Sequence, residues 1–386
     1  MQSDPAAATA AYIDGLGADN LARALAYTTG GHWLLLWSVL VSGVVCWIIV
    51  RMRLLERVEA RFVAGGTGLR AFAVGIAYFL CSALLLLPWS IYSGWWRERS
   101  YDRTAQPFGD YLMQSSIGVL LGAVLGSIFF MGVFALMRRT GRRWWIWSAA
   151  MTAVAAAVLI LIAPIMIEPI FNDYRPIPPG EVRDAIVVLA KSAGVSEDRI
   201  FVYDGSRQSN NFTANAGGIG GSARIAVSDV AWKGASLDEV KAVTGHEIGH
   251  YVLGHTWRGV ALVTALAVLF FFLIDRLFPR VAGAFGSHAT LDSPVGLPVM
   301  LFMASLFGLF GTPVMNAFAR YGETEADRYS LKNVGLPDAL ATALVKTAEY
   351  RYPRPGALEE ALFYDHPSVE RRVRMGMEWK AAHPPK

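Results

Sequence analysis

Long uncharged stretches separated by charged segments dominate the pattern of this chain and predict membrane-spanning helices. Four of them fall before residue 170, and two follow a central polar stretch; they cover residues 33–50, 71–96, 113–137, 144–167, 259–274 and 294–319. As a helix rising 1.5 Å per residue, the first spans about 27 Å, close to the thickness of a bilayer core. Buried core helices are also apolar, but four runs in the first 170 residues favour membrane spans. The fifth run is the shortest and fits either a full span or a segment that only dips into the membrane.

Composition supports this interpretation. The chain is 54% hydrophobic and 17% charged, with a mean hydropathy of +0.37, which is too apolar for an ordinary soluble enzyme. Residues 1–31 do not resemble a secretion signal, because three aspartates stand against the single Arg23 and no basic start precedes an apolar core. We expect this tail to be a surface helix or disordered. Cys46 and Cys81 both lie in apolar runs, so a metal site in the polar region is not thiolate-based.

The central polar stretch carries the string His246-Glu247-Ile248-Gly249-His250. On a helix, this H-E-x-x-H pattern puts two imidazoles one turn apart on one face, with a carboxylate beside them. Zinc binds two such neutral nitrogens at about 2.0–2.1 Å, and the carboxylate is a base for water activated by the metal. We therefore predict one Zn²⁺ per chain, with His246 and His250 as ligands and Glu247 as the general base. Two ordinary histidines are the alternative, since short motifs also arise by chance.

The sequence around the motif predicts a helix over residues 237–254. Ser236 and Glu239 have the spacing of a capping box, which starts helices. Gly245 and Gly249 each lower helix propensity by about 1 kcal/mol relative to alanine. Such a loss has a structural reason where a metal, a substrate or another backbone passes too close for a Cβ.

The third zinc ligand does not come from the extended form of the motif with a third histidine, because Leu253 and Thr256 occupy the required positions. His255 is nearby, but five residues beyond His250 is about 140° around a continuous helix, which is off the metal face. We expect His255 to be a polar residue at the membrane boundary.

An acidic cluster after the last apolar run offers a glutamate instead. Glu323 and Asp327 are four residues apart and share a helix face, whereas Glu325 points elsewhere and is expected to be solvated. We assign Glu323 as the third zinc ligand. Asp327 would accept a hydrogen bond from the far ring nitrogen of a ligating histidine and fix its tautomer. An exposed acidic helix face is the alternative.

Motifs in a fixed order between about residues 70 and 375 resemble one family. They are Leu87-Pro88-Trp89-Ser90-Ile91-Tyr92, residues 103–109 and 167–172, Ser209-Asn210-Asn211-Phe212, the Gly-His-Glu-x-Gly-His…Gly-His string of residues 245–255, Arg320-x-x-Glu323-x-x-Ala326-Asp327, and His366-Pro367 followed by Arg372-Val373. The chain is similar to the CAAX prenyl protease type 1 family, integral-membrane zinc peptidases of the gluzincin kind. It differs from the family in two respects. Six spans are predicted instead of the usual seven, and Asn211 stands where the family has alanine.

The resemblance implies a mainly α, polytopic membrane protein with about six transmembrane helices and a small α+β gluzincin-type zinc peptidase domain. We expect a tail (1–31), four spans (32–168), the peptidase domain (169–257), a transmembrane hairpin (258–319) and a C-terminal catalytic segment (320–386). It also implies a membrane zinc metalloendopeptidase that acts on short, extended or lipid-modified peptides or on damaged membrane proteins.

Alternation of apolar residues predicts strands over 199–204 and 223–228, and an edge strand over 210–214. A peptide substrate would pair with that edge, so Asn210, Asn211 and Phe212 are the candidate substrate-binding residues. His366 is the candidate that stabilises the oxyanion. A helix-capping histidine is the alternative for His366, and Arg372 is expected to pair structurally with a carboxylate.

The side of the membrane is open from sequence. Loops 51–70 and 138–143 hold nine arginines, against four on the other side, so the positive-inside rule puts the zinc site outside the cytoplasm. The resemblance implies a cytoplasmic site, in a bacterial inner membrane, and we favour that side.

Two other classes compete with the protease, namely a catalytically idle scaffold or chaperone that keeps a structural zinc, and a transporter. Retention of Glu247 argues against the first, and the absence of charge within the six runs argues against the second. The net charge of +4 is spread over arginines that flank the apolar runs, so no nucleic-acid surface is expected. The expected partners are a peptide or protein substrate and the bilayer. The sequence indicates no oligomeric state.

Overall fold

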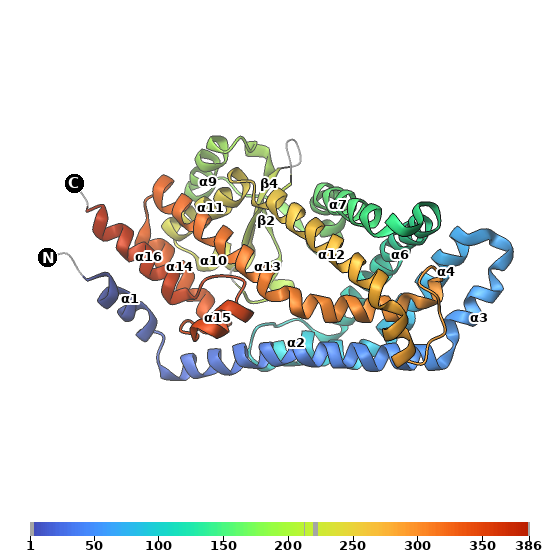
Figure 1. The fold of residues 1–386 in the computed structure, drawn as a ribbon. Helices are drawn as coiled ribbons and strands as arrows, with labels where there is room; N and C mark the ends of the chain where they lie inside the picture. The colour runs from blue at the N-terminus through green and yellow to red at the C-terminus, as the bar shows by residue number, and fades with distance from the viewer. Residues whose placement is uncertain (1–3, 212, 219–222, 385–386) are drawn as a thin grey trace.

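The computed structural model describes residues 4–211, 213–218 and 223–384, and most of them are helical (Figure 1). The long helices are α2 (Ala18–Met52), α4 (Gly66–Ile91), α6 (Phe108–Thr140), α7 (Trp144–Ile162), α12 (His255–Ala284) and α13 (Leu297–Asn333). The shorter ones are α1 (Pro5–Asp14), α3 (Leu54–Arg61), α5 (Arg97–Ser100), α8 (Glu168–Phe171), α9 (Glu181–Ser192), α10 (Asp229–Gly234), α11 (Leu237–Val252), α14 (Pro337–Lys346), α15 (Ala357–Phe363) and α16 (Val369–Ala382).

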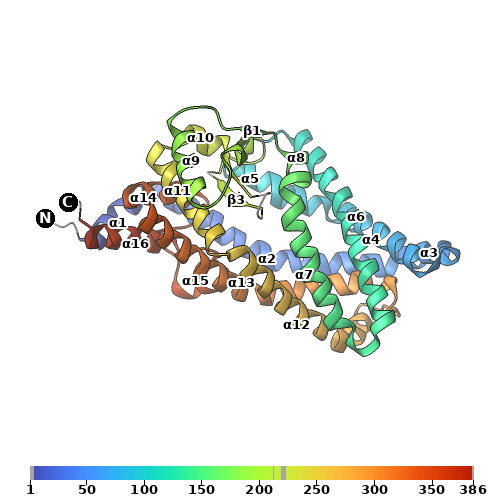
Figure 2. The same ribbon diagram turned by 90° about the horizontal axis from the view of Figure 1, so that it is seen from above.

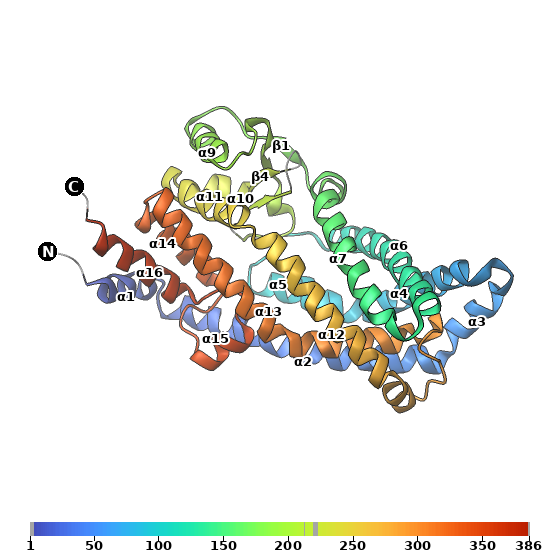
Figure 3. The same cartoon turned by 45° about the horizontal axis from the view of Figure 1, so that its top comes forward.

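The long helices match the predicted membrane spans. Within the described residues, 5 continuous helical segments are long and apolar enough to cross a bilayer. One of them, Phe108–Phe171, has 64 residues, which as a single straight helix would measure about 96 Å, three times a bilayer core. It instead turns back at Gly141, whose φ of 51° reverses the chain between α6 and α7, and the two helices run side by side (Figure 3). Counted this way, the six apolar stretches lie on six membrane-length helices of a multi-pass protein.

The N-terminal segment is helical and docked. Ile13 of α1 is completely buried and packs with Leu340 of α14 and with Val373 and Met377 of α16. Both described ends of the chain therefore lie close together, beside the polar domain that contains helices α9 to α11 and the sheet described below (Figures 1 and 2). The expected boundary between tail and first span, at residue 31, falls inside α2, which continues without interruption from the aqueous part into the apolar part.

The polar domain contains a four-stranded sheet. Its order is β1 (Tyr174–Pro176), β2 (Ile200–Tyr203), β4 (Arg224–Ser228), β3 (Ala214–Gly217), and β2 and β4 are parallel while the outer pairs are antiparallel. The predictions of β2 and β4 are confirmed. The edge strand predicted over 210–214 is displaced along the chain, since β3 begins at Ala214. Apolar side chains of the sheet and of α11, among them Ile225 and Ile248, pack into one core with α9.

The two glycines of α11 lie where α13 crosses it. A Cβ on Gly249 would lie 3.1 Å from the Ala326 Cα, and one on Gly245 would lie 2.4 Å from a methyl carbon of Val334. Another backbone therefore passes at this point, which was one of the predicted reasons for a glycine. The close crossing fixes the position of Glu323 and Asp327 on α13 relative to the histidines on α11.

Gly249→Val is expected to push α13 away from α11. Overpacking of this kind costs about 1–3 kcal/mol, so the variant should show a lower apparent Tm in detergent and weaker metal binding. Gly308→Val on α13 is the matched control, because nothing lies within 4 Å of its added Cβ. Equal Tm and equal metal content in the two variants would contradict the packing argument.

Candidate metal centre

The helix that carries the motif begins at the predicted capping box. The Ser236 backbone amide donates to Glu239 Oε2 at 2.7 Å, and the Glu239 amide donates to Ser236 Oγ at 3.2 Å. Lys346 of α14 donates to the same Glu239 oxygen at 2.7 Å. The start of α11 is thereby fixed, and with it the face on which His246 and His250 stand.

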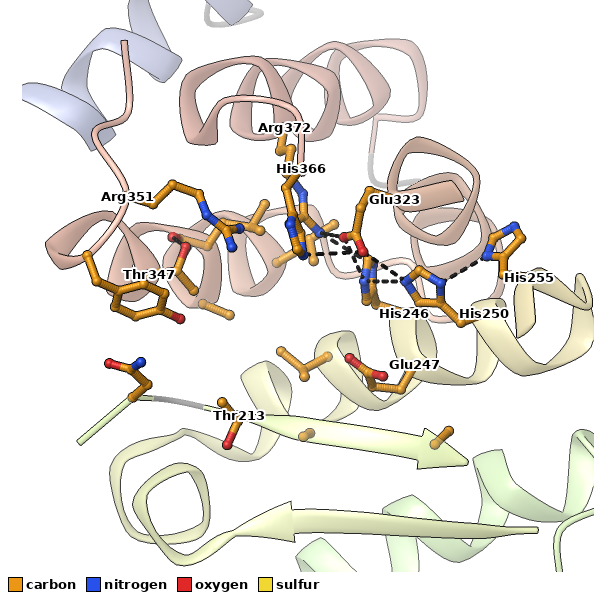
Figure 4. Close-up of a pocket in the computed structure, with 18 of the residues that line it drawn as sticks. Thr213, His246, Glu247, His250, His255, Glu323, Thr347, Arg351, His366 and Arg372 are labelled. Atoms are coloured by element: carbon orange, nitrogen blue, oxygen red, sulfur yellow. Dashed lines mark hydrogen bonds and ion pairs between the residues drawn. The ribbon is translucent and has the colours of Figure 1, made fainter. Parts of the chain in front are cut away.

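Three side chains that are far apart in the sequence converge above α11 (Figure 4). His246 Nε2 lies 3.1 Å from His250 Nε2. Glu323 of α13 closes the triangle, with Oε2 at 3.3 Å from His246 Nε2 and Oε1 at 3.3 Å from His250 Nε2.

This triangle has the dimensions of a metal site. Two donors that each bind a tetrahedral zinc at about 2.0–2.1 Å lie about 3.3 Å apart. Glu323 Oε2 is also buried and, within the described part of the chain, accepts no hydrogen bond, although the Arg372 guanidinium lies 3.3 Å away as an ion pair. A buried carboxylate oxygen without a hydrogen bond is costly, and a metal ion bound between the three donors would satisfy it directly. The donor set therefore fits a divalent metal.

His246 contacts a buried ion pair on the side of its ring that faces away from the metal site. The Nδ1 atom of His246 lies 2.8 Å from Asp327 Oδ1, and Asp327 is fully buried. Arg372 of α16 binds both oxygens of Asp327, each at 2.7 Å. Because a carboxylate only accepts, His246 donates from Nδ1 and keeps the lone pair of Nε2 for the metal.

A second hydrogen-bonded chain stands behind His250. His255 Nδ1 lies 2.9 Å from His250 Nδ1, and His255 Nε2 lies 3.2 Å from Glu325 Oε2. Glu325 can only accept, so a neutral His255 carries its proton on Nε2 and accepts at Nδ1 from His250. This arrangement leaves the Nε2 lone pair of His250 facing the metal site.

His255 lies at the start of a membrane helix, as expected, but the expectation that it lies off the metal face was wrong, as was the expectation that Glu325 points away from these residues. The angular argument assumed that α11 continues, but α11 ends at Val252 and Gly254 adopts a left-handed φ of 68°. A new helix, α12, then starts at His255 and returns it to the ligands. Glu325 is partly exposed and accepts hydrogen bonds from His255 and Arg258. A glycine just past the last turn is a typical helix terminator, and Gly254 was the signal available in the sequence.

Glu247 lies on the side of α11 that faces the sheet (Figure 4). Burial raises the pKa of its carboxyl, while the charges of the neighbouring histidines and a hydrogen bond from the Ala216 backbone oppose the rise. The contact with Ala216 places the carboxylate against the edge strand β3.

His366 approaches the triangle from the segment before α16. Its Nε2 is 3.3 Å from Glu323 Oε1, and its Nδ1 is 2.8 Å from Asp365 Oδ1. Arg320 of α13 holds this segment by donating to the backbone oxygens of Glu360 and Tyr364. Burial lowers the pKa of His366, and Asp365 acts in the opposite direction.

A cavity of about 600 Å³ opens over these groups, between β3 and α14. Asn211 lines it, whereas Asn210 is turned to the membrane domain, with its amide nitrogens donating to the backbone oxygens of Asp102 and Arg103. Phe212 lies outside the described residues. Of the three candidate substrate residues, the structure thus brings Asn211 to the cavity and gives Asn210 a partner elsewhere.

A helical membrane domain joined to a small sheet domain, with an H-E-x-x-H helix facing an acidic helix, is typical of membrane-embedded metallopeptidases. The chain belongs to peptidase family M48, whose family model matches residues 176–380. A second model, described as the CAAX prenyl protease N-terminal region with five membrane helices, matches residues 5–173.

Individual proteins support this membership. The uncharacterized metalloprotease YhfN of Bacillus subtilis is 26% identical over 353 residues, which cover 89% of this chain and 79% of that protein. The CAAX prenyl protease 1 homolog of Arabidopsis thaliana is 28% identical over 298 residues, covering 75% and 69%. The crystal structure of S. mikatae Ste24p has the same fold, with a TM-score of 0.77 at 20% identity over 93% of this chain and 89% of that one.

The chain is thus an integral-membrane metalloprotease, as predicted. Membership in a peptidase family does not favour the idle scaffold.

Loss of the His255 ring should weaken metal binding without removing a ligand. Replacing a residue that orients a metal ligand typically costs about 10–100-fold in affinity, so His255→Ala should lose metal to a competing chelator at correspondingly lower chelator concentrations. His288→Ala, on the exposed loop between α12 and α13, is the control. If both variants hold metal equally well, His255 does not position His250.

Proposed function

We propose that the metal is a single Zn²⁺ held by His246, His250 and Glu323, and that the protein is a zinc metalloendopeptidase. The observation that carries the proposal is the triangle of donor atoms 3.1–3.3 Å apart. Two imidazoles and one carboxylate are a common donor set of catalytic zinc, which leaves a position open for substrate or water. A zinc ion there supplies a Lewis acid that polarises the scissile carbonyl and lowers the pKa of water.

In this mechanism Glu247 is the general base. Its carboxylate takes a proton from the attacking water and passes it to the nitrogen of the leaving amine.

We assign His366 to the oxyanion of the tetrahedral intermediate. Asp365 holds the Nδ1 proton of His366, so a hydrogen bond from Nε2 to the oxyanion requires the doubly protonated ring. Burial lowers the pKa of His366 and opposes that form, and the Asp365 and Glu323 carboxylates offset this effect only in part. Asp327 and Arg372 act indirectly, by fixing the orientation of His246.

The substrate binds in an extended conformation along β3. Among the described residues, this strand pairs with β4 on one side only, so its other edge can accept a peptide. Asn211 lies at the entry to that edge, beside the cavity. We infer short, extended or lipid-modified peptides, or segments of damaged membrane proteins, as substrates, because several relatives are named CAAX prenyl protease 1 homologues and the cavity adjoins the membrane helices.

Glu247→Gln should retain the metal and lose peptide hydrolysis. Glutamine preserves the size of the side chain but cannot take a proton, and loss of a general base costs about 10²–10⁴-fold in kcat. Purified protein in detergent would be analysed for metal stoichiometry and for cleavage of a quenched peptide library, before and after chelation and zinc replacement. Cleavage by the variant at the wild-type rate would exclude Glu247 as the base.

We place the protease in a bacterial inner membrane with the metal site on the cytoplasmic side, as the resemblance to the prenyl protease family implies. The arginine-rich loops lie at the far end of the spans from α11 (Figure 1), so charge alone would favour the opposite orientation.

Cysteine accessibility distinguishes the two orientations. In a background in which Cys46 and Cys81 are replaced by alanine, His383→Cys after α16 and His288→Cys in the α12–α13 loop report opposite ends of the molecule. With a cytoplasmic site, a membrane-impermeant thiol reagent should label His288→Cys, and not His383→Cys, in intact spheroplasts. The reverse pattern would place the site outside.

A further inference from the structure

Arg351 lies at one end of the cavity, on a segment that is held on several sides. The backbone amide of Tyr352 donates to Thr28 of α2 at 2.9 Å, and the Tyr364 hydroxyl donates to the Tyr352 oxygen at 3.0 Å. Arg354 is tied to Asp14 and Glu370, each at 2.7 Å. The backbone around Arg351 is therefore fixed, and its side chain reaches the cavity from a defined point.

The guanidinium of Arg351 is weakly engaged by the protein. Its side chain is 21% exposed, and its ion pair with Asp365 is 3.6 Å long, beyond hydrogen-bond distance. It also lies 6.0 Å from the centre of the Tyr350 ring. Within the described part of the chain this guanidinium donates no hydrogen bond. Arg372, the other arginine that lines the cavity, donates to both oxygens of Asp327 and forms an ion pair with Glu323.

A guanidinium offers five hydrogen-bond donors, and the Arg351 side chain, at 21% exposure, keeps them accessible from the cavity. Asp365, whose side chain is 58% exposed, bonds to His366 through Oδ1, and Glu323 belongs to the metal triangle, so neither carboxylate accepts a hydrogen bond from Arg351. In Figure 4 the Arg351 guanidinium points into the cavity, across from Thr213. A ligand that enters the cavity can therefore supply an acceptor to these donors.

The direction of β3 tells which part of a substrate would reach Arg351. Thr213 directly precedes β3, and the strand runs from there toward Glu247 and the histidines (Figure 4). Antiparallel pairing has the more favourable hydrogen-bond geometry, so a bound peptide would run the other way, with its C-terminal part toward Thr213. Apolar side chains of α14 line the cavity in between, namely Leu340, Ala343 and Leu344.

We propose that Arg351 forms a carboxylate-binding subsite that receives the C-terminal side of the substrate, beyond the scissile bond. The carboxylate is either the free C-terminus of a peptide or the side chain of an acidic residue at that position. Arginine matches both, because its planar fork donates two parallel hydrogen bonds to a carboxylate. The proposal rests on the proposed peptidase function, and it assigns Arg351 to specificity rather than to the chemical step.

The test compares three peptides that share one sequence and differ at the C-terminus. One ends in a free carboxylate, one in a carboxamide, and one in a carboxamide with glutamate as its last residue. Affinities of dye-labelled forms would be measured on full-length, detergent-purified Glu247→Gln protein, with and without Arg351→Gln or Arg351→Lys. Arg374→Gln, on the exposed side of α16, is the matched control.

The free acid should bind about tenfold more tightly than the carboxamide, as expected for one hydrogen-bonded charge pair. This ratio should fall to near one in Arg351→Gln, recover partly in Arg351→Lys and stay unchanged in Arg374→Gln. Tight binding of the glutamate carboxamide would identify an acidic side chain as the ligand, and tight binding of the free acid alone would identify the C-terminus. Equal affinity for all three peptides, or a preference that persists in Arg351→Gln, would overturn the proposal.

Because these are binding ratios within one protein, they do not depend on turnover. Failure of Glu247→Gln to abolish cleavage would count against the assigned mechanism, and the binding ratios would then be measured on chelator-treated protein, in which the peptides stay intact. The same acid-to-amide ratio in kcat/KM of the active protein provides a second readout, which a general loss of stability in the variants would not shift.

Discussion

The close crossing of α11 and α13 is the constraint on which the site depends. Gly245 and Gly249 each cost helix propensity on the order of 1 kcal/mol, and in return the α13 backbone reaches the surface of α11. Only at that separation can Glu323 touch both histidine nitrogens at 3.3 Å. A larger side chain at either glycine would lengthen both distances from Glu323 to the histidine nitrogens together, because the two histidines stand on α11 and Glu323 stands on α13.

Each histidine ligand is oriented by an acidic residue through its Nδ1 atom. Asp327 contacts His246 directly, whereas Glu325 acts on His250 through His255. Asp327 is fully buried and carries its own counter-ion in Arg372, so its charge is neutralised within the protein. Glu325 acts through His255 at the boundary with the membrane helices. Both arrangements force the proton onto Nδ1 and leave Nε2 for the metal. The pair of tautomers is thus determined by residues on α12 and α13 rather than by α11 itself.

Much of this architecture could be predicted from the sequence, for identifiable reasons. The six spans follow from uninterrupted apolar stretches, and the start of α11 follows from the Ser236 and Glu239 pair, both of which are local signals. The face shared by Glu323 and Asp327 follows from helix geometry. The position of β3 was wrong by a few residues, because a short edge strand in a loop-rich region has little periodic signal. The role of His255 was missed because the left-handed turn at Gly254 resets the helical phase, and Arg351 was missed because nothing in the sequence brings residue 351 near residue 213.

The continuity of α13 has a consequence for how this enzyme can be dissected. The same 37-residue helix contains the last apolar stretch and, further along, Glu323. The carboxylate that completes the donor triangle is therefore carried by a transmembrane helix. An excised fragment that ends after α11 would contain the signature motif and still lack a complete coordination sphere. Unlike peptidases whose catalytic module is merely tethered to a bilayer, this one cannot be released from its anchor by trimming a linker.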